Sequence, residues 1–251
     1  MDLLLTFDWW VVAILAAIAG VARGLSGFGI GLIMMPIGGA LLTPAFMVPV
    51  LSILDSPASV FLLAEAWKRI DKRDVLILAS AAAVCMPAGI WILTYVEAGT
   101  VAVCANAVAL ATAVALLAGL RLRGAPSLAR SLATGGLSGV LQGAAALPGP
   151  PIILGWVAAQ IPGPALRANI IAYFALIDAL VVPMLWITGL FTVEVLWFGA
   201  SLLPLYLGGV LIGRKAFGVI SEGLFRRVVL GLVILGALSG IVVVSLGGGA
   251  G

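Results

Sequence analysis

Two carboxylates of this chain lie inside long apolar stretches, where an ionised side chain is costly to bury. Asp55 lies within residues 51–57 and Asp178 within residues 173–179, and most of their neighbours are apolar. Acidic residues at membrane depth are rare and mark ion paths, substrate paths or proton relays. The sequence therefore predicts that Asp55 and Asp178 lie on a transport path or carry a coupling proton. Two alternatives remain, in which Asp178 only hydrogen-bonds a neighbouring helix and Asp55 caps a helix that begins at Pro57.

Two segments rich in glycine and proline could supply a second kind of chemistry, the binding of an anion by backbone N–H groups. The first covers residues 24–31 and precedes Pro36, and the second covers residues 135–143 and precedes residues 147–151. Proline lacks an N–H and clashes with the preceding turn, so these segments predict helix breaks. Inside a membrane a break must be buried in protein or line a polar cavity, where adjoining helix N-termini favour an anion. The alternative is that glycines at four-residue spacing only let helices pack closely.

Residues at and beside the two breaks form the predicted substrate site. Backbone N–H groups, hydroxyls, amides and an arginine fork can all donate hydrogen bonds to an oxyanion. The predicted substrate-binding residues are Arg23, Ser26, Gly27, Phe28, Gly29, Ser138, Gln142, Gly143, Pro148, Gly149, Pro150 and Asn169. Arg23 and Arg167 have a second interpretation, as charges that only fix the topology.

Composition excludes several other kinds of site. The chain has no histidine, which removes the Ser-His-Asp triad, the Cys-His pair and the histidine zinc site. Its two cysteines, Cys85 and Cys104, lie in apolar runs and indicate neither a disulfide framework nor a metal site. The net charge of +3 is concentrated in loops, which does not indicate nucleic-acid binding. We therefore expect no cofactor, no metal and no nucleic-acid partner.

The elements that must position these residues are membrane-spanning helices. Hydrophobic residues make up 63% of the chain and charged residues 9%, whereas soluble domains carry about 25% charged residues. The apolar runs between charged clusters are roughly 18–22 residues long and continuous, which fits helices across a bilayer. The fold class predicted is all-α, a polytopic transmembrane bundle. The expected spans are 9–22, 28–43, 46–66, 74–95, 100–120, 131–147, 150–160, 167–188, 193–213 and 225–246.

The basic loops predict how the bundle is oriented. Lysines and arginines cluster at residues 68–73, 121–130 and 214–227, and the remaining connections are acidic or neutral. The positive-inside rule places these clusters in the cytoplasm, so both termini are expected outside an inner membrane. The short spans 9–22, 28–43, 131–147 and 150–160 can be full crossings or re-entrant segments.

The chain also shows weak internal repetition. Gly20 and Gly24 line up with Gly135 and Gly139, and Pro36 with Pro151, each 115 positions apart. We predict that residues 1–123 and 127–251 are two transmembrane repeats of a single membrane domain. An odd number of spans in each half would invert the second repeat, and inverted repeats are typical of transporters.

Four stretches, taken in their order along the chain, resemble those of a known family. They are the Gly-Phe-Gly-Ile-Gly-Leu-Ile-Met-Met-Pro stretch that ends at Pro36, the loop at 68–74, the break at 147–151 and the stretch 220–229. Together they make nearly the whole chain similar to the sulfite exporter TauE/SafE family, also called the toluene sulfonate uptake group. This resemblance implies a bacterial inner-membrane carrier for sulfur-containing anions or related organic acids.

These features favour a secondary transporter of a small anion that works by alternating access. The anion would lie between the two broken segments, and one half would rock against the other. The partners expected are the anion and the lipid bilayer, with a homodimer as one possible assembly. One alternative is a membrane partner subunit that transports nothing. The other is an intramembrane enzyme in which Asp55 and Asp178 form an acid dyad.

Overall fold

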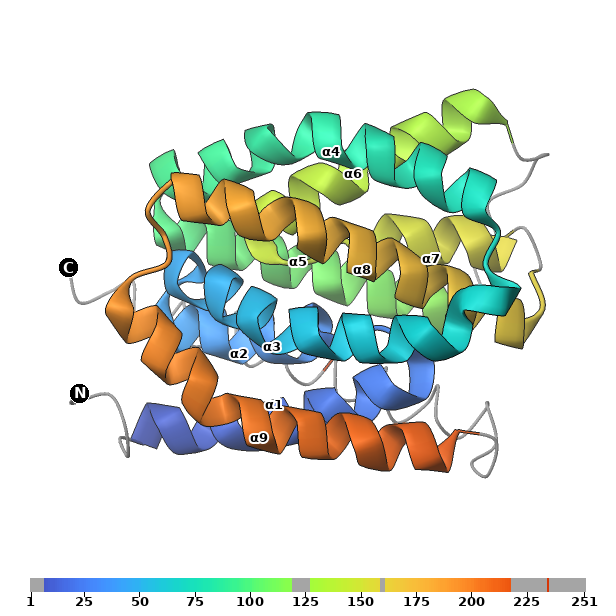
Figure 1. Ribbon diagram of the computed structural model, residues 1–251. Coiled ribbons are helices and arrows are strands. Elements are labelled where there is room, and N and C mark those ends of the chain that lie inside the picture. Colours follow the sequence, from blue (N-terminus) through green and yellow to red (C-terminus); the bar gives the residue numbers. More distant parts are fainter. Residues whose placement is uncertain (1–6, 119–126, 159–160, 218–233, 235–251) are drawn as a thin grey trace.

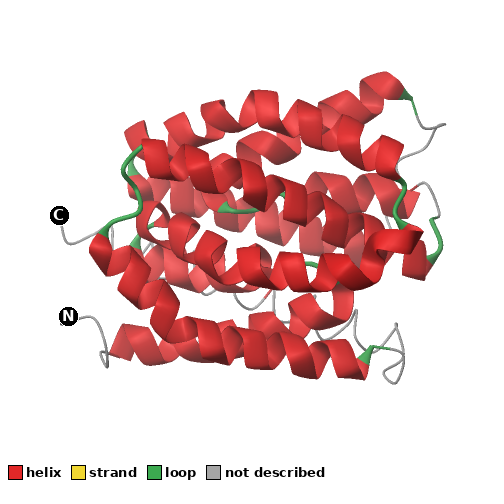
Figure 2. Ribbon diagram, viewed as in Figure 1, coloured by secondary structure: helices red, strands yellow, loops and turns green. Residues whose placement is uncertain are grey.

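The computed structural model describes residues 7–118, 127–158, 161–217 and 234. Every regular element in these residues is a helix (Figure 2). The elements are α1 (Phe7–Ser26), α2 (Ile30–Leu42), α3 (Pro44–Ala66), the 3-10 turn η1 (Trp67–Arg69), α4 (Lys72–Tyr95), α5 (Ala98–Leu117), α6 (Leu128–Ala145), α7 (Gly149–Ala158), α8 (Gly163–Ile187) and α9 (Val193–Ala216). Five of the helices are long and apolar enough to cross a bilayer. These helices confirm the predicted all-α membrane bundle.

Nine of the predicted spans correspond to these nine helices, and the tenth, 225–246, lies outside the described residues. Helix α3 confirms the predicted span 46–66 and decides the alternative role of Asp55 as a helix cap. That helix continues through Pro49 and Pro57 without interruption, because a helix packed among others in a membrane can satisfy the carbonyls that a proline leaves free. Asp55 therefore lies in the interior of α3, and its interpretation as the cap of a helix that begins at Pro57 is wrong.

The bundle has two distinguishable ends. We call one the basic end, because it carries η1 and the start of α4, at the right of Figure 1. There α3 ends and α9 ends beside it, joined by an ion pair between Glu65 and Arg214. At the opposite end α1 begins next to the first turns of α9, where Trp9 Nε1 donates a hydrogen bond to Ser201 Oγ at 2.9 Å.

Helices α6 and α7 form a hairpin, which we call hairpin 2 (residues 128–158). Asp74 of α4 accepts hydrogen bonds from Ser131, near the start of α6, and from Trp156, near the end of α7, at 3.3 and 2.6 Å. Both ends of the hairpin therefore lie at the basic end. Further in, Ser138 Oγ donates to the carbonyl oxygen of Pro148 at 2.5 Å, so α7 runs back along α6.

Helices α1 and α2 form hairpin 1 (residues 7–42), which enters from the opposite end. Its chain reverses at Gly27 and Gly29, whose φ angles of 83° and 116° are conformations that side-chain-bearing residues rarely adopt. Helix α2 then returns toward the opposite end, where α3 begins. The tips of the two hairpins touch, because a Cβ on Gly31 would fall on the carbonyl oxygen of Ala146.

Each hairpin packs closely against one long helix through glycine residues, and we call these two contacts the glycine seams. Figure 1 shows α1 beside α9 and α6 beside α4. A Cβ on Gly20 or Gly24 of α1 would meet backbone atoms of α9, and one on Gly139 or Gly143 of α6 would meet backbone atoms of α4. Such close backbone approach is how small residues hold helices together in lipid. In both seams the first helix of one predicted repeat packs on the fourth helix of the other, while the inverted relation of the repeats stays a prediction.

The seam between α1 and α9 supplies a matched pair for a stability test. A Cβ on Gly209 would meet the carbonyl oxygen of Ala17, whereas a Cβ on the adjacent Gly208 has nothing within 4 Å. We expect Gly209→Ala to lower the free energy of unfolding by about 1–3 kcal/mol, since it overpacks the seam. We expect Gly208→Ala to leave the stability unchanged. Thermal unfolding in detergent compares the two, and equal unfolding temperatures would contradict a tight seam.

Candidate functional site

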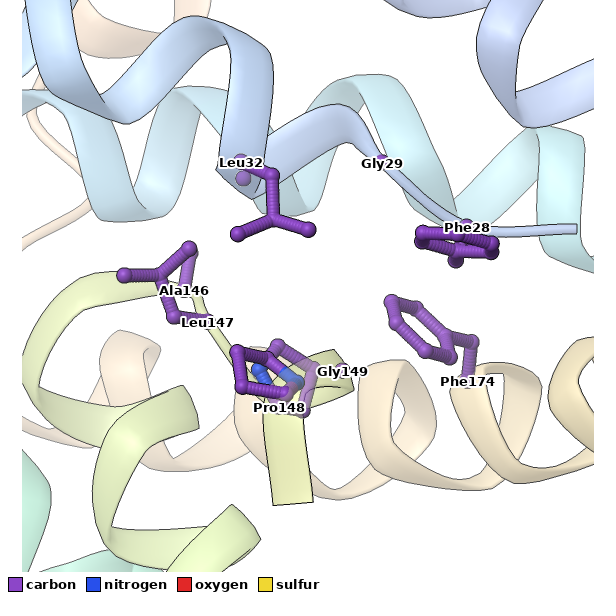
Figure 3. Close-up of a pocket in the computed structure, with 10 residues that line it drawn as sticks. Phe28, Gly29, Leu32, Ala146, Leu147, Pro148, Gly149 and Phe174 are labelled. Carbon is purple, nitrogen blue, oxygen red and sulfur yellow. The ribbon is translucent and has the colours of Figure 1, made fainter. Parts of the chain in front are cut away.

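A small pocket lies where the tips of the two hairpins meet. Figure 3 shows Leu32 of α2 facing Leu147 and Pro148, with Phe28 beside Phe174 of α8. The lining comes from both breaks and from α8, and it consists of Phe28, Gly29, Gly31, Leu32, Ala146, Leu147, Pro148, Gly149, Pro150 and Phe174. The pocket has a cavity volume of about 10 Å³. This is roughly the volume that one water molecule needs. An anion larger than water therefore requires the tips to separate.

Two helix N-termini border this pocket. Helix α2 begins at Ile30, directly after the first break, and α7 begins at Gly149, directly after the second. The first N–H groups of a helix have no carbonyl partner within it, and the helix dipole places partial positive charge there. Pro150 and Pro151 contribute no N–H, so α2 offers more donors than α7. The pocket combines apolar walls with backbone donors, which suits an oxyanion on a small organic body.

The first break is shaped by the hydroxyl of Ser26. Its Oγ donates to the carbonyl oxygen of Ala22 at 2.8 Å and accepts from the N–H of Phe28 at 3.2 Å. This hydroxyl replaces helical hydrogen bonds that the chain loses as it leaves α1. Ser26 therefore holds the tip of hairpin 1 in shape and presents Phe28 and Gly29 to the pocket.

Arg23 lies behind this break and is fully buried, with 0% of its surface exposed. Its Nε donates to Asp55 Oδ1 at 2.7 Å, and its Nη2 donates to Ser59 Oγ at 2.6 Å. Its Nη1 donates to the carbonyl oxygen of Gly27 at the tip. The guanidinium also lies 4.8 Å from the ring centroid of Phe174, which lines the pocket. Arg23 does not line the pocket itself but connects its wall to a buried carboxylate.

Two further bonds extend this connection across the bundle. Tyr206 of α9 donates to Asp55 Oδ1 at 2.7 Å, and Ser59 donates to Asp178 Oδ2 at 2.6 Å. Asp55 and Asp178 are 3% and 5% exposed. We call the five residues Arg23, Asp55, Ser59, Asp178 and Tyr206 the buried network. It ties α1, α3, α8 and α9 together at the depth of the first break.

The second break is held by neutral groups. Ser138 donates to Pro148, as described above, and its Oγ accepts a hydrogen bond from the hydroxyl of Tyr173 at 2.7 Å. Ser138 and Tyr173 are both buried, with 0% of their surface exposed. Arg23 and Ser138 stand 115 positions apart, the offset that relates the two predicted repeats. The two tips are therefore supported at corresponding positions, one by a cation and the other by a hydroxyl.

Several predicted site residues lie away from the pocket. Gly143 belongs to the seam with α4, and Asn169 lies at the basic end, where its Oδ1 accepts from the N–H of Asp71 at 2.8 Å. Gln142 is buried on α6, and its backbone carbonyl accepts from the N–H of Ala146. Arg167 donates to the carbonyl oxygens of Gly24 and Leu25, so it neutralises the C-terminus of α1 at the basic end. None of these four residues lines the pocket.

Sequence reasoning missed other members of the site. They are Ser59 and Tyr206 of the buried network, Tyr173 behind the second break, and Phe174 and Leu32 in the pocket wall. Ser59 carried a usable signal, since it follows Asp55 by four positions and so shares its helix face. Tyr206 carried none, because it is far along the chain from every other member.

Comparison with known proteins bears on what this site does. A family model described as "Sulfite exporter TauE/SafE" matches residues 12–248, nearly the whole chain. That range includes both breaks and the entire buried network. No curated protein and no solved structure gave a match. The family match confirms the resemblance that the four sequence stretches carried.

Proposed function

Since the chain belongs to the sulfite exporter TauE/SafE family of membrane transporters, we propose that it carries a small anion by alternating access. The anion is held between the tips of the two hairpins. The observation that carries this proposal is that two hairpins enter from opposite ends and meet at a buried pocket bordered by the N-termini of α2 and α7. A site between broken helices that face each other is typical of secondary transporters.

The chemistry of the pocket supports the proposed substrate class. Backbone N–H groups at helix N-termini bind the oxygens of sulfite, a sulfonate or a carboxylate without a basic side chain. A full positive charge in the pocket would hold an anion tightly and slow its release. The apolar walls formed by Phe28, Leu32 and Phe174 accommodate the organic part of a sulfonate or an organic acid.

The two glycine seams indicate which helices would move together during transport. If one predicted repeat rocked against the other, both glycine seams would have to open, because each joins a helix of residues 1–123 to one of residues 127–251. Tight backbone contacts of this kind favour units that move together. We therefore propose α1 with α9 as one moving unit and α4 with α6 as the other, on either side of the packed pair α3 and α8. The basic end faces the cytoplasm in this proposal, as the positive-inside rule requires.

The two alternative functions find less support in the geometry. An acid dyad must present both carboxylates to the bond that it cleaves. Asp55 and Asp178 are buried in the network and do not line the pocket, and Asp55 is ion-paired with Arg23. A membrane partner subunit that transports nothing has no use for two breaks that meet at a pocket.

The experiment that tests the function is flux through the purified protein in sealed liposomes. Uptake of radiolabelled sulfite, sulfoacetate, taurine and simple carboxylates is measured with and without a proton gradient. We expect saturable uptake of at least one of the anions and competition by unlabelled substrate. No uptake of any of them into vesicles that are shown to be sealed and loaded would favour the partner-subunit alternative.

A matched pair of glycines tests whether the first break shapes the pocket. Gly29 has a φ of 116° and lines the pocket, whereas Gly189 has a φ of 73° in the loop between α8 and α9. A side chain at a positive φ costs about 1–3 kcal/mol in either place. We expect Gly29→Ala to lower the initial uptake rate about tenfold, as about 1.4 kcal/mol would, and Gly189→Ala to lower it far less. Equal rates for the two variants would count against a site at this tip.

A further inference from the structure

The buried network holds more negative than positive charge. Among the residues that the structure describes, the buried charged side chains are Arg23, Asp55 and Asp178, one cation with two carboxylates. Asp55 accepts from both Arg23 and Tyr206 through Oδ1. Asp178 accepts from the hydroxyl of Ser59 and has no cation within 4 Å among the described residues. The two carboxylates are therefore not equivalent, since only Asp55 is neutralised by a direct ion pair.

Among the residues that the structure describes, no positive charge other than Arg23 faces Asp178. The titratable groups of these residues that face it are Arg23 from α1, Asp55 from α3 and Tyr206 from α9. Helix α4 also packs on α8, and its buried face consists of apolar residues and glycine. An ionised carboxylate without a paired cation is unfavourable away from water, and a bound proton removes that penalty.

We propose that Asp178 is a proton-binding site and that Arg23 couples its protonation to anion binding between the hairpin tips. This inference rests on the function proposed above and adds the coupling ion to it. One proton binds the carboxylate of Asp178 from the side to which the pocket is open, and the same proton leaves to the other side after the transition. No other bond is made or broken.

Arg23 is the physical link, because it contacts both the proton site and the pocket. Its Nη2 donates to Ser59, which donates to Asp178, while its Nη1 donates to Gly27 at the tip and its guanidinium faces Phe174 of the pocket wall. When Asp178 loses its proton, the new negative charge attracts the guanidinium away from the tip. The network then has a net charge of −1, which repels an anion in the pocket.

The sign of the coupling follows from this geometry. Protonation of Asp178 makes the network neutral, leaves Arg23 on the carbonyl of Gly27 and favours the anion. The anion and the proton therefore bind together and travel in the same direction, which makes the protein a proton–anion symporter. Anion affinity falls as the pH rises through the range in which Asp178 releases its proton.

The test separates exchange from accumulation in proteoliposomes, with radiolabelled sulfite and sulfoacetate as probes. Counterflow at equal pH on both sides measures anion exchange, and uptake under a proton gradient measures coupling. We expect wild-type protein to accumulate the label when the proton gradient points in the same direction. We expect Asp178→Asn to retain pH-independent counterflow and to lose accumulation. Glu97→Gln, which removes an exposed carboxylate outside the network, is the control and should match wild type.

Two outcomes would overturn the inference in different ways. Absence of uptake and counterflow in wild-type protein with sulfite, sulfoacetate, taurine and the simple carboxylates alike would remove the proposed function and this inference with it. Normal counterflow with an unchanged pH profile and unchanged accumulation in Asp178→Asn would remove the coupling role alone.

A second variant covers the case in which Asp178→Asn does not fold. Ser59→Ala removes the hydroxyl that donates to Asp178 and leaves both charges of the Arg23–Asp55 pair in place. Loss of a donor to the ionised form favours the protonated form, so the pH midpoint of counterflow should rise by about one unit. A midpoint equal to that of wild type would overturn the proposal.

Discussion

Arg23→Met is expected to lower the free energy of unfolding by about 3–5 kcal/mol and to abolish transport. The substitution keeps most of the apolar stem of the side chain but leaves Asp55 buried without its cation. It also removes the donors to Ser59 and Gly27, so the tip of hairpin 1 loses its support. Thermal unfolding in detergent and initial uptake rates in proteoliposomes measure the two effects.

Two further variants separate the ion pair from the rest of the side chain. Arg167→Met is the matched control, because Arg167 is only partly buried and donates to the carbonyls of Gly24 and Leu25. We expect a smaller loss of stability there. The double variant Arg23→Met/Asp55→Asn removes both charges and keeps an acceptor for Tyr206. It should therefore recover most of the stability that Arg23→Met loses. Proton-driven accumulation should remain absent in the double variant. If Arg23→Met unfolds at the wild-type temperature, the ion pair does not stabilise the fold.

The positions of the helices could be predicted from the sequence because a bilayer imposes them locally. An apolar run of fixed length between charged clusters specifies a span without reference to any other part of the chain. The second break was predicted at 147–151 for the same reason, since prolines act on their own turn of backbone. It lies at 146–148, because Pro150 and Pro151 belong to the first turn of α7, where a helix tolerates proline. Pro57 misled only the interpretation of Asp55 as a helix cap, because an isolated proline inside a helix is tolerated where neighbouring helices surround it.

The partners of buried side chains could not be predicted, because they depend on how distant helices pack. Arg23 was interpreted as a topology charge or an anion ligand, and the structure instead pairs it with Asp55, 32 positions away. Nothing in the spacing of Tyr206 and Asp55 indicates that they touch across 151 positions. Asn169 looked like a donor near the site, yet the direction of α8 places it at the basic end.

The glycines of the first segment also differ in whether their role depends on local backbone conformation or on packing against a distant helix. The predicted chain break and the predicted close packing apply to different glycines of the first segment, while anion binding there stays a prediction. Gly27 and Gly29 reverse the chain, whereas Gly20 and Gly24 lie in a regular helix and let α9 approach. Four-residue spacing alone could not assign them, because the end of α1 falls inside the first segment at Ser26.

Gly31→Val is expected to lower the initial uptake rate about a hundredfold, an effect equivalent to about 2.7 kcal/mol. The added Cβ would fall on the carbonyl oxygen of Ala146, and it would lie 3.2 Å from a methyl carbon of Leu147. The two tips could then no longer touch, and the closed state that separates the two sides of the membrane would be strained. Uptake of sulfite and sulfoacetate into proteoliposomes measures the loss at equal amounts of reconstituted protein.

Gly155→Ala is the control within hairpin 2, because a Cβ there would meet only a methyl carbon of Thr134 at an ordinary 3.7 Å. Its uptake rate should stay within about twofold of wild type, because ordinary contacts cost little. The strain in Gly31→Val is relieved when the tips move apart, so that variant should lose transport with less loss of thermal stability than Gly209→Ala. Transport and stability should therefore respond differently in these two variants. The seam stabilises the fold in every state of the protein, whereas contact between the tips is needed only to close the path. Wild-type uptake by Gly31→Val would mean that the anion crosses somewhere other than between the hairpins.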